Sequence, residues 1–397
     1  MIGNLEASVI NNVPIIMTHS TKKIGIDARF YGPGSKGLGR YTQEIVDRVI
    51  KTKNDYEYVV FLSLENFKNF KCDNKKVKKV LVKARWYSLS EQIIFPFQIW
   101  KEKLDLMHFT HFNVPILTPV KFVVTIHDLI LAKFSTVRAT TLSPFLYKIK
   151  NLGYKIVIWI AIKRAKKVIA VSFYTRDDIL SKFKIKKEKI AMIYEGVSIL
   201  FKTRCATVVG VRAVLEKYRI KPPFLLYVGN AYPHKNLENL IDVFLKIRQK
   251  NKNLNLVLVG KEDYFYNRLK EYAKEKGVPV VFAGFAPDED LEIFFREALC
   301  YVFPSFYEGF GLPPLEAMTR GCPVLSSKES CLPEVLGEAA VFFDPYNKKD
   351  MANKIEQVMK NEKLREDLID KGFEQYKKFS WDKAAKETLE VYQKVLE

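Results

Sequence analysis

The sequence predicts an α/β fold made of two doubly wound domains that face a central cleft. Short apolar runs of strand length alternate with longer helical patterns along the chain. The runs are continuously apolar, which is typical of parallel strands covered by helices on both faces. The 397 residues suit two or three domains better than one, and 48% hydrophobic residues exclude a disordered chain.

The first half of the chain is expected to hold seven strands and three helices. The strands are predicted at Lys23–Arg29, Tyr58–Ser63, Lys78–Lys83, Leu106–His111, Phe122–His127, Val168–Val171 and Ala191–Tyr194. The helices are predicted at Leu38–Lys51, Ser90–Lys101 and Ser143–Lys166.

The second half repeats this alternation more regularly. Its strands are predicted at Phe224–Gly229, Asn255–Gly260, Val280–Gly284, Cys300–Ser305, Pro323–Ser327 and Val341–Asp344. Its helices are predicted at Leu237–Lys250, Tyr264–Lys276, Asp288–Leu299, Pro314–Arg320 and Lys348–Asn361. Two such runs indicate two domains, with ligands bound where the carboxyl ends of the strands face each other.

The remaining segments set the predicted boundaries. Ile199–Thr207 has neither helical nor strand period and is interpreted as the linker, and two helices are left over at Lys363–Phe379 and Trp381–Leu396. Ser380 is a plausible N-cap that turns the last helix back onto the first domain. The predicted division is an N-terminal extension at 1–21, a first domain at 22–203, a second at 204–380 and a returning helix at 381–397.

The net charge of +20 indicates an anionic partner: nucleic acid, a membrane surface or a phosphorylated ligand. Residues 1–200 carry 34 Lys and Arg against 16 Asp and Glu, whereas residues 201–397 carry 31 against 29. No nucleic-acid-binding motif accompanies the charge, so nucleic acid is not expected as a partner. Residues 85–87, 95–100 and 145–167 interleave aromatic and basic residues. They are either core and solvated faces or a contact with an anionic membrane.

The five cysteines form no CxxC pair, which argues against a disulfide framework or a zinc cluster and favours the cytoplasm. No apolar run reaches the length of a membrane helix. The chain is therefore expected in the cytoplasm, with the inner face of the cytoplasmic membrane as a further possibility.

The segment from Ser305 to Met318 carries the strongest chemical signal. A predicted strand ends at Ser305, a glycine-containing loop follows, and prolines open the next helix. The amides of Phe310, Gly311 and Leu312 are expected to face a ligand anion. Glu316, expected in the first helical turn, is a candidate for the two hydroxyls of a ribose. Glu308 is placed to hold hydroxyls of a sugar beyond the phosphates.

Other candidates follow further strands. Lys235 lies in a loop after a strand, where a compact ammonium suits a diphosphate. The loop Gly32–Arg40 follows the first strand and opens a helix, a place where amides cradle phosphate. His108 and His111 share an HxxH spacing, but on a strand they fall on opposite faces, which disfavours a shared metal. His111 and Asn113 are expected on the acceptor side.

The stretch Glu308–Met318, with Glu316 eight residues after Glu308, closely resembles the signature of retaining glycosyltransferases of family 4. Weaker motifs stand in the family's order, at Gly25–Arg29, Lys36–Arg40, Thr125–Asp128, Val171–Ser172, Tyr227–Gly229, Pro233–Asn236 and Leu332–Val335. The resemblance covers nearly the whole chain from about Lys22. It implies the GT-B fold of two Rossmann-like domains, with the second binding the nucleotide sugar and the first the acceptor.

The resemblance also implies roles for individual residues. It places Gly37 and Leu38 against the donor diphosphate, and Gly39 and Arg40 towards the acceptor, although Arg40 could face either substrate. It makes His127 a donor-sugar contact and, with Glu308 and Lys235, a catalytic candidate. It assigns the loop with Gly284 and Phe285 to the base. The family usually has an Arg where this chain has Asn230, which removes one cation from the diphosphate site.

The resemblance therefore implies transfer of a hexose from a nucleoside diphosphate sugar, with retention and without cofactor or metal. The Pro233–Asn236 and Gly25–Arg29 motifs resemble those of bacterial mannosyltransferases that build cell-surface polysaccharide. GDP-mannose is therefore the expected donor, and a saccharide or lipid-linked saccharide the acceptor. Another GDP- or UDP-sugar donor, a sugar-nucleotide epimerase of the same fold and a basic nucleic-acid-binding protein are the alternatives.

Overall fold

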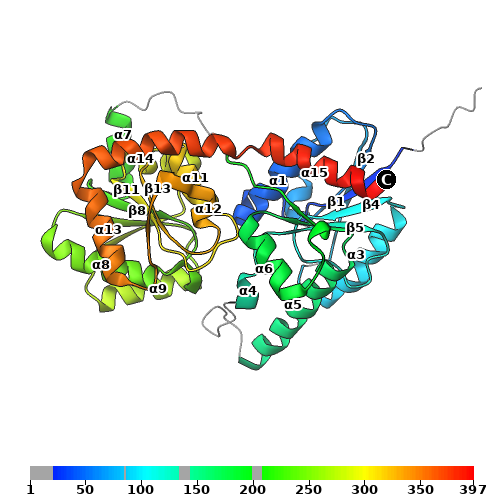
Figure 1. The fold of residues 1–397 in the computed structure, drawn as a ribbon, viewed down its shortest axis with the longest axis horizontal. Helices are drawn as coiled ribbons and strands as arrows, with labels where there is room; N and C mark the ends of the chain where they lie inside the picture. The colour runs from blue at the N-terminus through cyan, green and yellow to red at the C-terminus, as the bar shows by residue number, and fades with distance from the viewer. Residues whose placement is uncertain (1–20, 85, 134–143, 199–207) are drawn as a thin grey trace, which may run out of the picture.

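A computed structural model describes residues 21–84, 86–133, 144–198 and 208–397. These residues form two parallel sheets, each in its own α/β domain (Figure 1). The first sheet has the order β3 (Val77–Leu81), β2 (Glu57–Leu62), β1 (Lys23–Asp27), β4 (Leu106–Phe109), β5 (Phe122–Ile126), β6 (Lys167–Ala170) and β7 (Ile190–Met192). The second has the order β10 (Val280–Gly284), β9 (Asn255–Val259), β8 (Phe224–Val228), β11 (Cys300–Phe303), β12 (Val324–Ser327) and β13 (Ala340–Phe343).

Every described strand pair is parallel, so the carboxyl ends of each sheet lie along one edge. Each of the thirteen strands among the described residues corresponds to a run predicted from the sequence, with ends that differ by at most two residues. The fold of two doubly wound domains is therefore confirmed. The strands form because their apolar residues are buried on both faces, as in β5, where all five side chains are buried.

Two layers of helices cover the first sheet. Helices α1 (Lys36–Lys51) and α15 (Trp381–Leu396) cover one face, where Ile45 and Tyr392 belong to one core cluster. Helices α3 (Leu89–Lys101), α5 (Pro144–Arg164) and α6 (Phe173–Phe183) cover the other, where Phe95, Ile158 and Ile179 belong to a second cluster. Figure 1 shows the two layers on opposite sides of the sheet.

The second sheet is covered by a further set of helices. They are α8 (Leu237–Lys250), α9 (Tyr264–Glu275), α10 (Asp288–Glu297), α11 (Leu312–Met318), α12 (Leu332–Leu336), α13 (Lys348–Lys360) and α14 (Glu362–Gln375). Shorter or peripheral helices are α2 (Leu64–Phe67), α4 (Ile130–Lys133) and α7 (Val208–Lys217).

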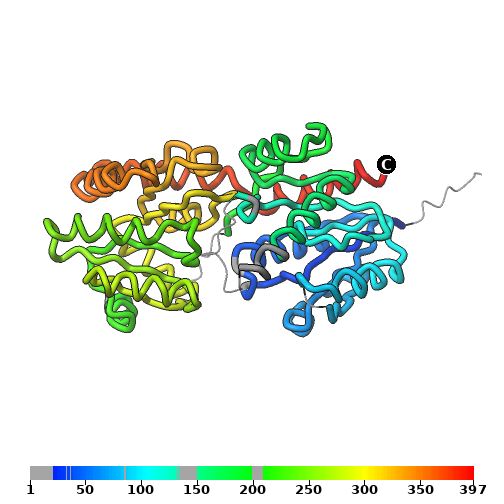
Figure 2. Tube along the Cα trace, turned by 90° about the horizontal axis from the view of Figure 1, so that it is seen from below, coloured from blue at the N-terminus to red at the C-terminus, as the bar shows by residue number. Residues whose placement is uncertain are grey.

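The last helix returns to the first domain, as the sequence predicts. Figure 2 shows the C-terminal chain passing from the second domain to the first. Ser380 caps α15 by accepting a hydrogen bond from Lys383 N. The Tyr392 hydroxyl lies 2.5 Å from His108 Nδ1, and Arg48 Nε lies 2.6 Å from Asp382. Burial lowers the pKa of His108 to about 3, so this histidine is a neutral anchor for α15.

The helical predictions need correction, and the short helices α2, α4 and α12 have no predicted counterpart. Helix α11 begins at Leu312 rather than Pro314, so Glu316 lies in its second turn and no acidic residue occupies the first. The sequence does not predict α6, which Ser172 caps by accepting a hydrogen bond from Thr175 N. Nor does it predict α7. Residues 1–20 and the linker Ile199–Thr207 lie outside the described residues, so the predicted domain boundaries stay predictions.

Candidate active site

The loop between β11 and α11 carries Glu308 to the carboxyl edge of the second sheet. The Glu308 amide donates a hydrogen bond to Ser330 Oγ at 3.0 Å, and its carbonyl accepts one from Cys331 Sγ at 3.4 Å. These contacts come from the segment after β12, so two neighbouring strand ends hold the loop. The Glu308 side chain is 10% exposed, so a small part of it remains in contact with solvent.

Lys235 meets Glu308 from the loop after β8. Its Nζ lies 2.6 Å from Glu308 Oε1 and 5.4 Å from the centre of the Phe303 ring. The neighbouring Asn236 adopts a left-handed conformation with φ of 61° and donates hydrogen bonds to the carbonyls of Pro304 and Pro345. These bonds fasten the lysine loop to the Glu308 loop. The structure therefore brings together two of the three residues predicted to be catalytic.

The residues around this pair differ in what they can offer a ligand. Asn230 Oδ1 accepts a hydrogen bond from Tyr232 N at 3.3 Å. Gly284 ends β10 with φ of 69°, and the following Phe285 ring is 75% exposed. Burial and the nearby Lys235 lower the pKa of His234 to about 3. His234 is thus neutral at physiological pH and adds no charge next to Lys235.

Glu316 of the second domain contacts Arg40 of the first domain. The Arg40 guanidinium from α1 forms an ion pair with the Glu316 carboxylate from α11, and it lies 4.0 Å from Asp288. The Glu316 and Arg40 side chains are 18% and 28% exposed, so solvent reaches both. The carboxylate predicted to hold a ribose is therefore engaged by a cation from the other domain.

The glycine-rich loop before Arg40 is shorter than the sequence suggests, because α1 begins at Lys36. Gly37, Leu38, Gly39 and Arg40 consequently form its first turns. A Cβ at Gly39 would lie 2.0 Å from the carbonyl oxygen of Gly32, so only glycine permits this return of the loop. Gly37 is exposed and has open space at that position. The first amides of α1 lack helical partners, and this is the property that anions exploit.

His127 follows β5, but it is not the free imidazole that its place at the cleft edge predicts. Its Nδ1 lies 2.8 Å from Glu195 Oε1 and its Nε2 lies 3.0 Å from the Thr110 carbonyl, so both ring nitrogens face acceptors. Burial alone lowers the pKa of His127, but the hydrogen bond and charge of Glu195 outweigh burial and raise it. Glu195 and the Thr110 carbonyl therefore favour the protonated form of the ring. The backbone carbonyl of His127 accepts a bond from Thr175 Oγ1 at 3.2 Å.

The two acceptor-side candidates lie deeper. His111 contacts the rings of Phe30 and Phe112, and its buried Nδ1 has no hydrogen-bond partner among the described residues. Burial, with the positive neighbours His127 and Arg29, lowers its pKa well below the usual value, so the ring is neutral. Asn113 Nδ2 donates a bond of 2.6 Å to the buried Glu91. Of the two, His111 has the unengaged polar atom.

The two domains contact each other at Gly309, the residue that follows Glu308. Gly309 O accepts hydrogen bonds from Ser172 Oγ at 2.8 Å and Thr175 Oγ1 at 3.3 Å. A Cβ at Gly309 would lie 2.0 Å from the His127 carbonyl oxygen. The absence of a side chain at Gly309 therefore lets its backbone approach the first domain, not a ligand. Glu334 accepts bonds from the amides of Phe173 and Tyr174, which begin α6.

The neighbouring Phe310 also belongs to this domain contact. Its ring is 4% exposed and packs against Tyr194 of the first domain and Phe379 of the returning chain. Its side chain is therefore structural, and only its backbone remains for a ligand. Gly311, with φ of 97°, ends the loop in a left-handed conformation that favours glycine and leads into Leu312.

Sequence reasoning missed two acidic residues of the site. Glu195 follows β7 and orients the His127 ring through a hydrogen bond. Asp128 follows His127 and interacts electrostatically with Glu308. Burial and then Glu308 raise the pKa of Asp128. Both residues follow predicted strands, so the rule that strand ends carry the chemistry could have found them. Among the described residues, no group of three or more His, Cys, Asp or Glu side chains is arranged to bind a metal ion.

The halves of the chain match two protein-family models in order. Residues 35–199 match the model described as Glycosyltransferase Family 4, and residues 213–375 match the one described as Glycosyl transferases group 1. Together these matches span most of the chain and both sheets.

Curated relatives share part of this length. The chain is 31% identical over 234 residues to O-antigen chain mannosyltransferase B of Escherichia coli, covering 57% of this chain and 60% of that protein. It is 27% identical to O-antigen chain mannosyltransferase RfbU of Salmonella typhimurium, covering 69% of this chain and 70% of that protein. The first match thus spans less than two thirds of the relative.

Solved structures show the same fold at low identity. Sucrose-phosphate synthase from Thermosynechococcus elongatus has a TM-score of 0.75 at 19% identity, covering 94% of this chain and 99% of that one. Anabaena HepE in complex with UDP and glucose has a TM-score of 0.70 at 17% identity, covering 94% and 100%. With the two domain models in order, the chain belongs to the glycosyltransferases that join a Family 4 domain to a group 1 domain.

Proposed function

We propose that this chain transfers a hexose from a nucleoside diphosphate sugar to an acceptor hydroxyl and retains the anomeric configuration. One observation carries the proposal: Lys235 and Glu308 meet at 2.6 Å at the carboxyl edge of the second sheet. An ammonium beside a carboxylate suits a ligand that combines a diphosphate with sugar hydroxyls. The pair is accessible enough for such a ligand to separate it.

The donor would lie in the second domain, with its base at the loop of Gly284 and Phe285 and its ribose on Glu316. For Glu316 to accept ribose hydroxyls, the Arg40 guanidinium must move off its carboxylate. GDP-mannose is our first choice of donor, because relatives at 27% and 31% identity are named O-antigen chain mannosyltransferases. Another GDP- or UDP-sugar is the alternative, since the fold neighbour HepE is described with UDP and glucose.

Catalysis would rest on the charge that develops on the leaving diphosphate. The bond between the anomeric carbon and the phosphate oxygen breaks, and a bond to the acceptor oxygen forms on the same face. The acceptor proton passes to the leaving phosphate. Lys235, the amides of Phe310, Gly311 and Leu312, and the nearby Asn230 amide would stabilise the phosphate charge without a metal. Because α11 has only seven residues, these groups contribute more than its helix dipole.

The first domain would bind the acceptor and complete the sugar site. Gly37 and Leu38 would approach the diphosphate from α1, and Gly39, Arg40, His111 and Asn113 would lie on the acceptor side. His127 would contact the donor sugar as a fixed cation rather than as a proton acceptor, because both of its nitrogens already face acceptors. Glu308 would hold hydroxyls of the transferred sugar.

We place this reaction in the cytoplasm, in the synthesis of a cell-surface polysaccharide, with a saccharide or lipid-linked saccharide as acceptor. Incubation with radiolabelled GDP-mannose, UDP-glucose, ADP-glucose and dTDP-glucose, each with native membranes, tests the proposal. The expected result is label in a glycan from GDP-mannose alone. Label from another donor would correct the sugar nucleotide, and conversion of the sugar nucleotide without acceptor would indicate an epimerase instead.

A further inference from the structure

The outer face of α3 carries a row of large apolar side chains that remain exposed. Leu89, Ile93, Phe97 and Trp100 follow the spacing of one helical face, and their exposed fractions are 85%, 74%, 53% and 64%. The opposite side of the same helix is buried through Phe95 and Ile99. Helix α3 is thus apolar on both sides. Packing against the domain core accounts only for the apolar residues on its inner side.

Helix α5 repeats this arrangement in the same layer. Leu152, Ile156 and Trp159 are exposed by 61%, 44% and 53%, and their spacing of four and three residues places them on one face. Both helices pack into the second core cluster, so their outer faces point to the same side of the first domain. Figure 1 shows α3 and α5 together on the side opposite α1 and α15.

The loop between β4 and β5 connects the two rows. Ile116 N donates a hydrogen bond to Gln92 Oε1 of α3 at 2.8 Å, and Arg164 of α5 donates one to the Thr118 carbonyl at 3.0 Å. The side chain between these bonds, Leu117, is 75% exposed. We call these residues of α3, α5 and Leu117 the apolar face. Groups of exposed apolar side chains on one side of a domain mark sites of interaction.

Basic residues border the apolar face. Helix α5 contains no Asp or Glu and holds Lys155 and Lys163 within its apolar pattern. On α3, Lys101 Nζ lies 4.5 Å from the centre of the Phe97 ring. At the far end of α5, Lys189 lies close enough to Lys163 and Lys166 that burial and then their charges lower its pKa. This concentration of positive charge favours binding to an anionic surface.

We propose that the apolar face docks on an anionic lipid bilayer. Its aliphatic and aromatic side chains would enter the boundary between headgroups and acyl chains, and the lysines would meet lipid phosphates. Trp100 and Trp159 suit that boundary, because one edge of an indole is polar and the rest apolar. Charge favours a bilayer over a second copy of the chain, since two copies face to face would oppose their lysines. None of the described helices is long and apolar enough to span the bilayer.

Docking would also orient the cleft. Helices α3 and α5 follow β3 and β5, so both begin at the carboxyl edge of the first sheet, which borders the site. A docked apolar face would hold this edge next to the bilayer. Under the proposed function, a lipid-linked acceptor would then meet the site without leaving the membrane. The docking itself requires no particular donor.

Co-sedimentation of the full chain with vesicles tests the proposal without any sugar nucleotide. Phosphatidylcholine vesicles with about 30% phosphatidylglycerol are compared with pure phosphatidylcholine. We expect binding to the anionic vesicles, and a loss of at least about ten-fold in affinity for the Phe97→Ser/Trp100→Ser and Ile156→Ser/Trp159→Ser variants. Lys101→Ala and Lys155→Ala should each weaken binding about five-fold.

The matched control is Leu64→Ser/Val209→Ser, which removes two exposed apolar side chains from α2 and α7. It should bind as the unaltered chain does. A second readout is a blue shift of tryptophan fluorescence on vesicle addition, which Trp100→Phe/Trp159→Phe should abolish. Undiminished binding by the apolar-face variants would overturn the proposal. So would equal binding to uncharged vesicles, or a dimer in solution that Phe97→Ser/Trp100→Ser dissociates.

Discussion

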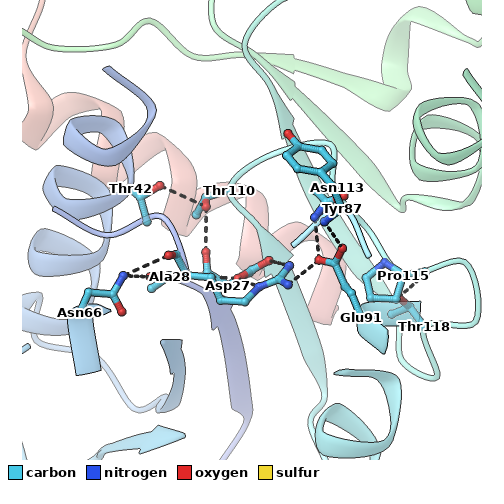
Figure 3. A network of polar contacts seen from close by, with 11 residues as sticks. Asp27, Ala28, Thr42, Asn66, Tyr87, Glu91, Thr110, Asn113, Pro115 and Thr118 are labelled. Atoms are coloured by element: carbon cyan, nitrogen blue, oxygen red, sulfur yellow. Dashed lines mark hydrogen bonds and ion pairs between the residues drawn. The ribbon is translucent and has the colours of Figure 1, made fainter. Parts of the chain in front are cut away.

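The carboxyl edges of the two sheets both gather charged residues, but they use them differently. In the first sheet, Arg29 binds Asp27 and Glu91 in a network that is almost fully buried. In the second, the Lys235–Glu308 pair is partly exposed. Figure 3 shows the buried network, with Glu91 accepting hydrogen bonds from Asn113 and the Tyr87 amide. A buried, fully bonded network holds structure, whereas an accessible pair can exchange its partner for a ligand.

The same network explains the fate of one predicted site residue. The Arg29 guanidinium also lies 4.2 Å from the centre of the Phe95 ring. Its edges donate hydrogen bonds to Asp27, and its face packs on the aromatic ring. Asn113 contributes to this network through Glu91. An acceptor that bound Asn113 would have to compete with the Asn113–Glu91 hydrogen bond. In this respect Asn113 differs from Glu308 and Lys235, which are partly exposed.

The largest expected effect is on the buried network. Glu91→Ala should lower the free energy of unfolding by about 3–5 kcal/mol, because it leaves Arg29 buried without one of its carboxylates. Urea unfolding followed by circular dichroism measures the loss. The triple variant Asp27→Asn/Arg29→Met/Glu91→Leu should be more stable than Glu91→Ala, since it leaves none of the three buried charges without a partner. A Glu91→Ala loss below about 1 kcal/mol would contradict the structural role.

The next effect is on turnover. Lys235→Ala should lower kcat about 10²–10³-fold, because the ammonium stabilises charge on the leaving diphosphate. The unfolding midpoint should stay nearly unchanged, because the Lys235–Glu308 pair is partly exposed. Glu308→Gln should act in the same direction through the transferred sugar. Lys270→Ala is the matched control, since Lys270 pairs with Glu262 on an exposed surface of the same domain. Near-normal turnover by either site variant would remove that residue from the catalytic set.

A smaller effect separates the two ends of the Arg40–Glu316 pair. Glu316→Gln should weaken GDP binding about ten-fold or more, because a charged acceptor for the ribose hydroxyls is lost. Arg40→Ala should leave GDP binding unchanged or tighten it a few-fold, because it removes the cation that occupies Glu316. Titration calorimetry measures both. If Arg40→Ala weakened binding as much as Glu316→Gln does, Arg40 would belong to the donor site rather than the acceptor side.

The smallest expected effect concerns pH. Glu195 raises the pKa of His127, so the pair contributes stability that is complete below the unfolded pKa of about 6.5. This contribution is lost as the pH rises through the higher folded pKa. Glu195→Gln should therefore lower the free energy of unfolding more at about pH 6 than at about pH 9, with a difference on the order of 1 kcal/mol. Urea unfolding at the two pH values measures it, and equal destabilisation at both would show that His127 is not held as a cation.

Local patterns account for most of the fold. The strand β10 and the helices α8 and α15 have the predicted bounds, because a continuous apolar run or a helical period is a property of neighbouring residues. Helix α6 escapes prediction because its start depends on other segments. Its first amides donate to Glu334 of the second domain, which lies far away in the sequence.

Local sequence patterns were enough to predict two parallel sheets, the loops after strands that carry Glu308 and Lys235, the helix that carries Glu316, and the return of α15. These follow from periodicity, from caps and from the rule that parallel strands end at one edge. The pairing of charges, such as Arg40 with Glu316 and His127 with Glu195, became visible only in the folded chain. The tertiary structure also decided which apolar side chains face outward on α3 and α5. Partner choice and exposure depend on distances between segments remote in sequence, which no local pattern contains.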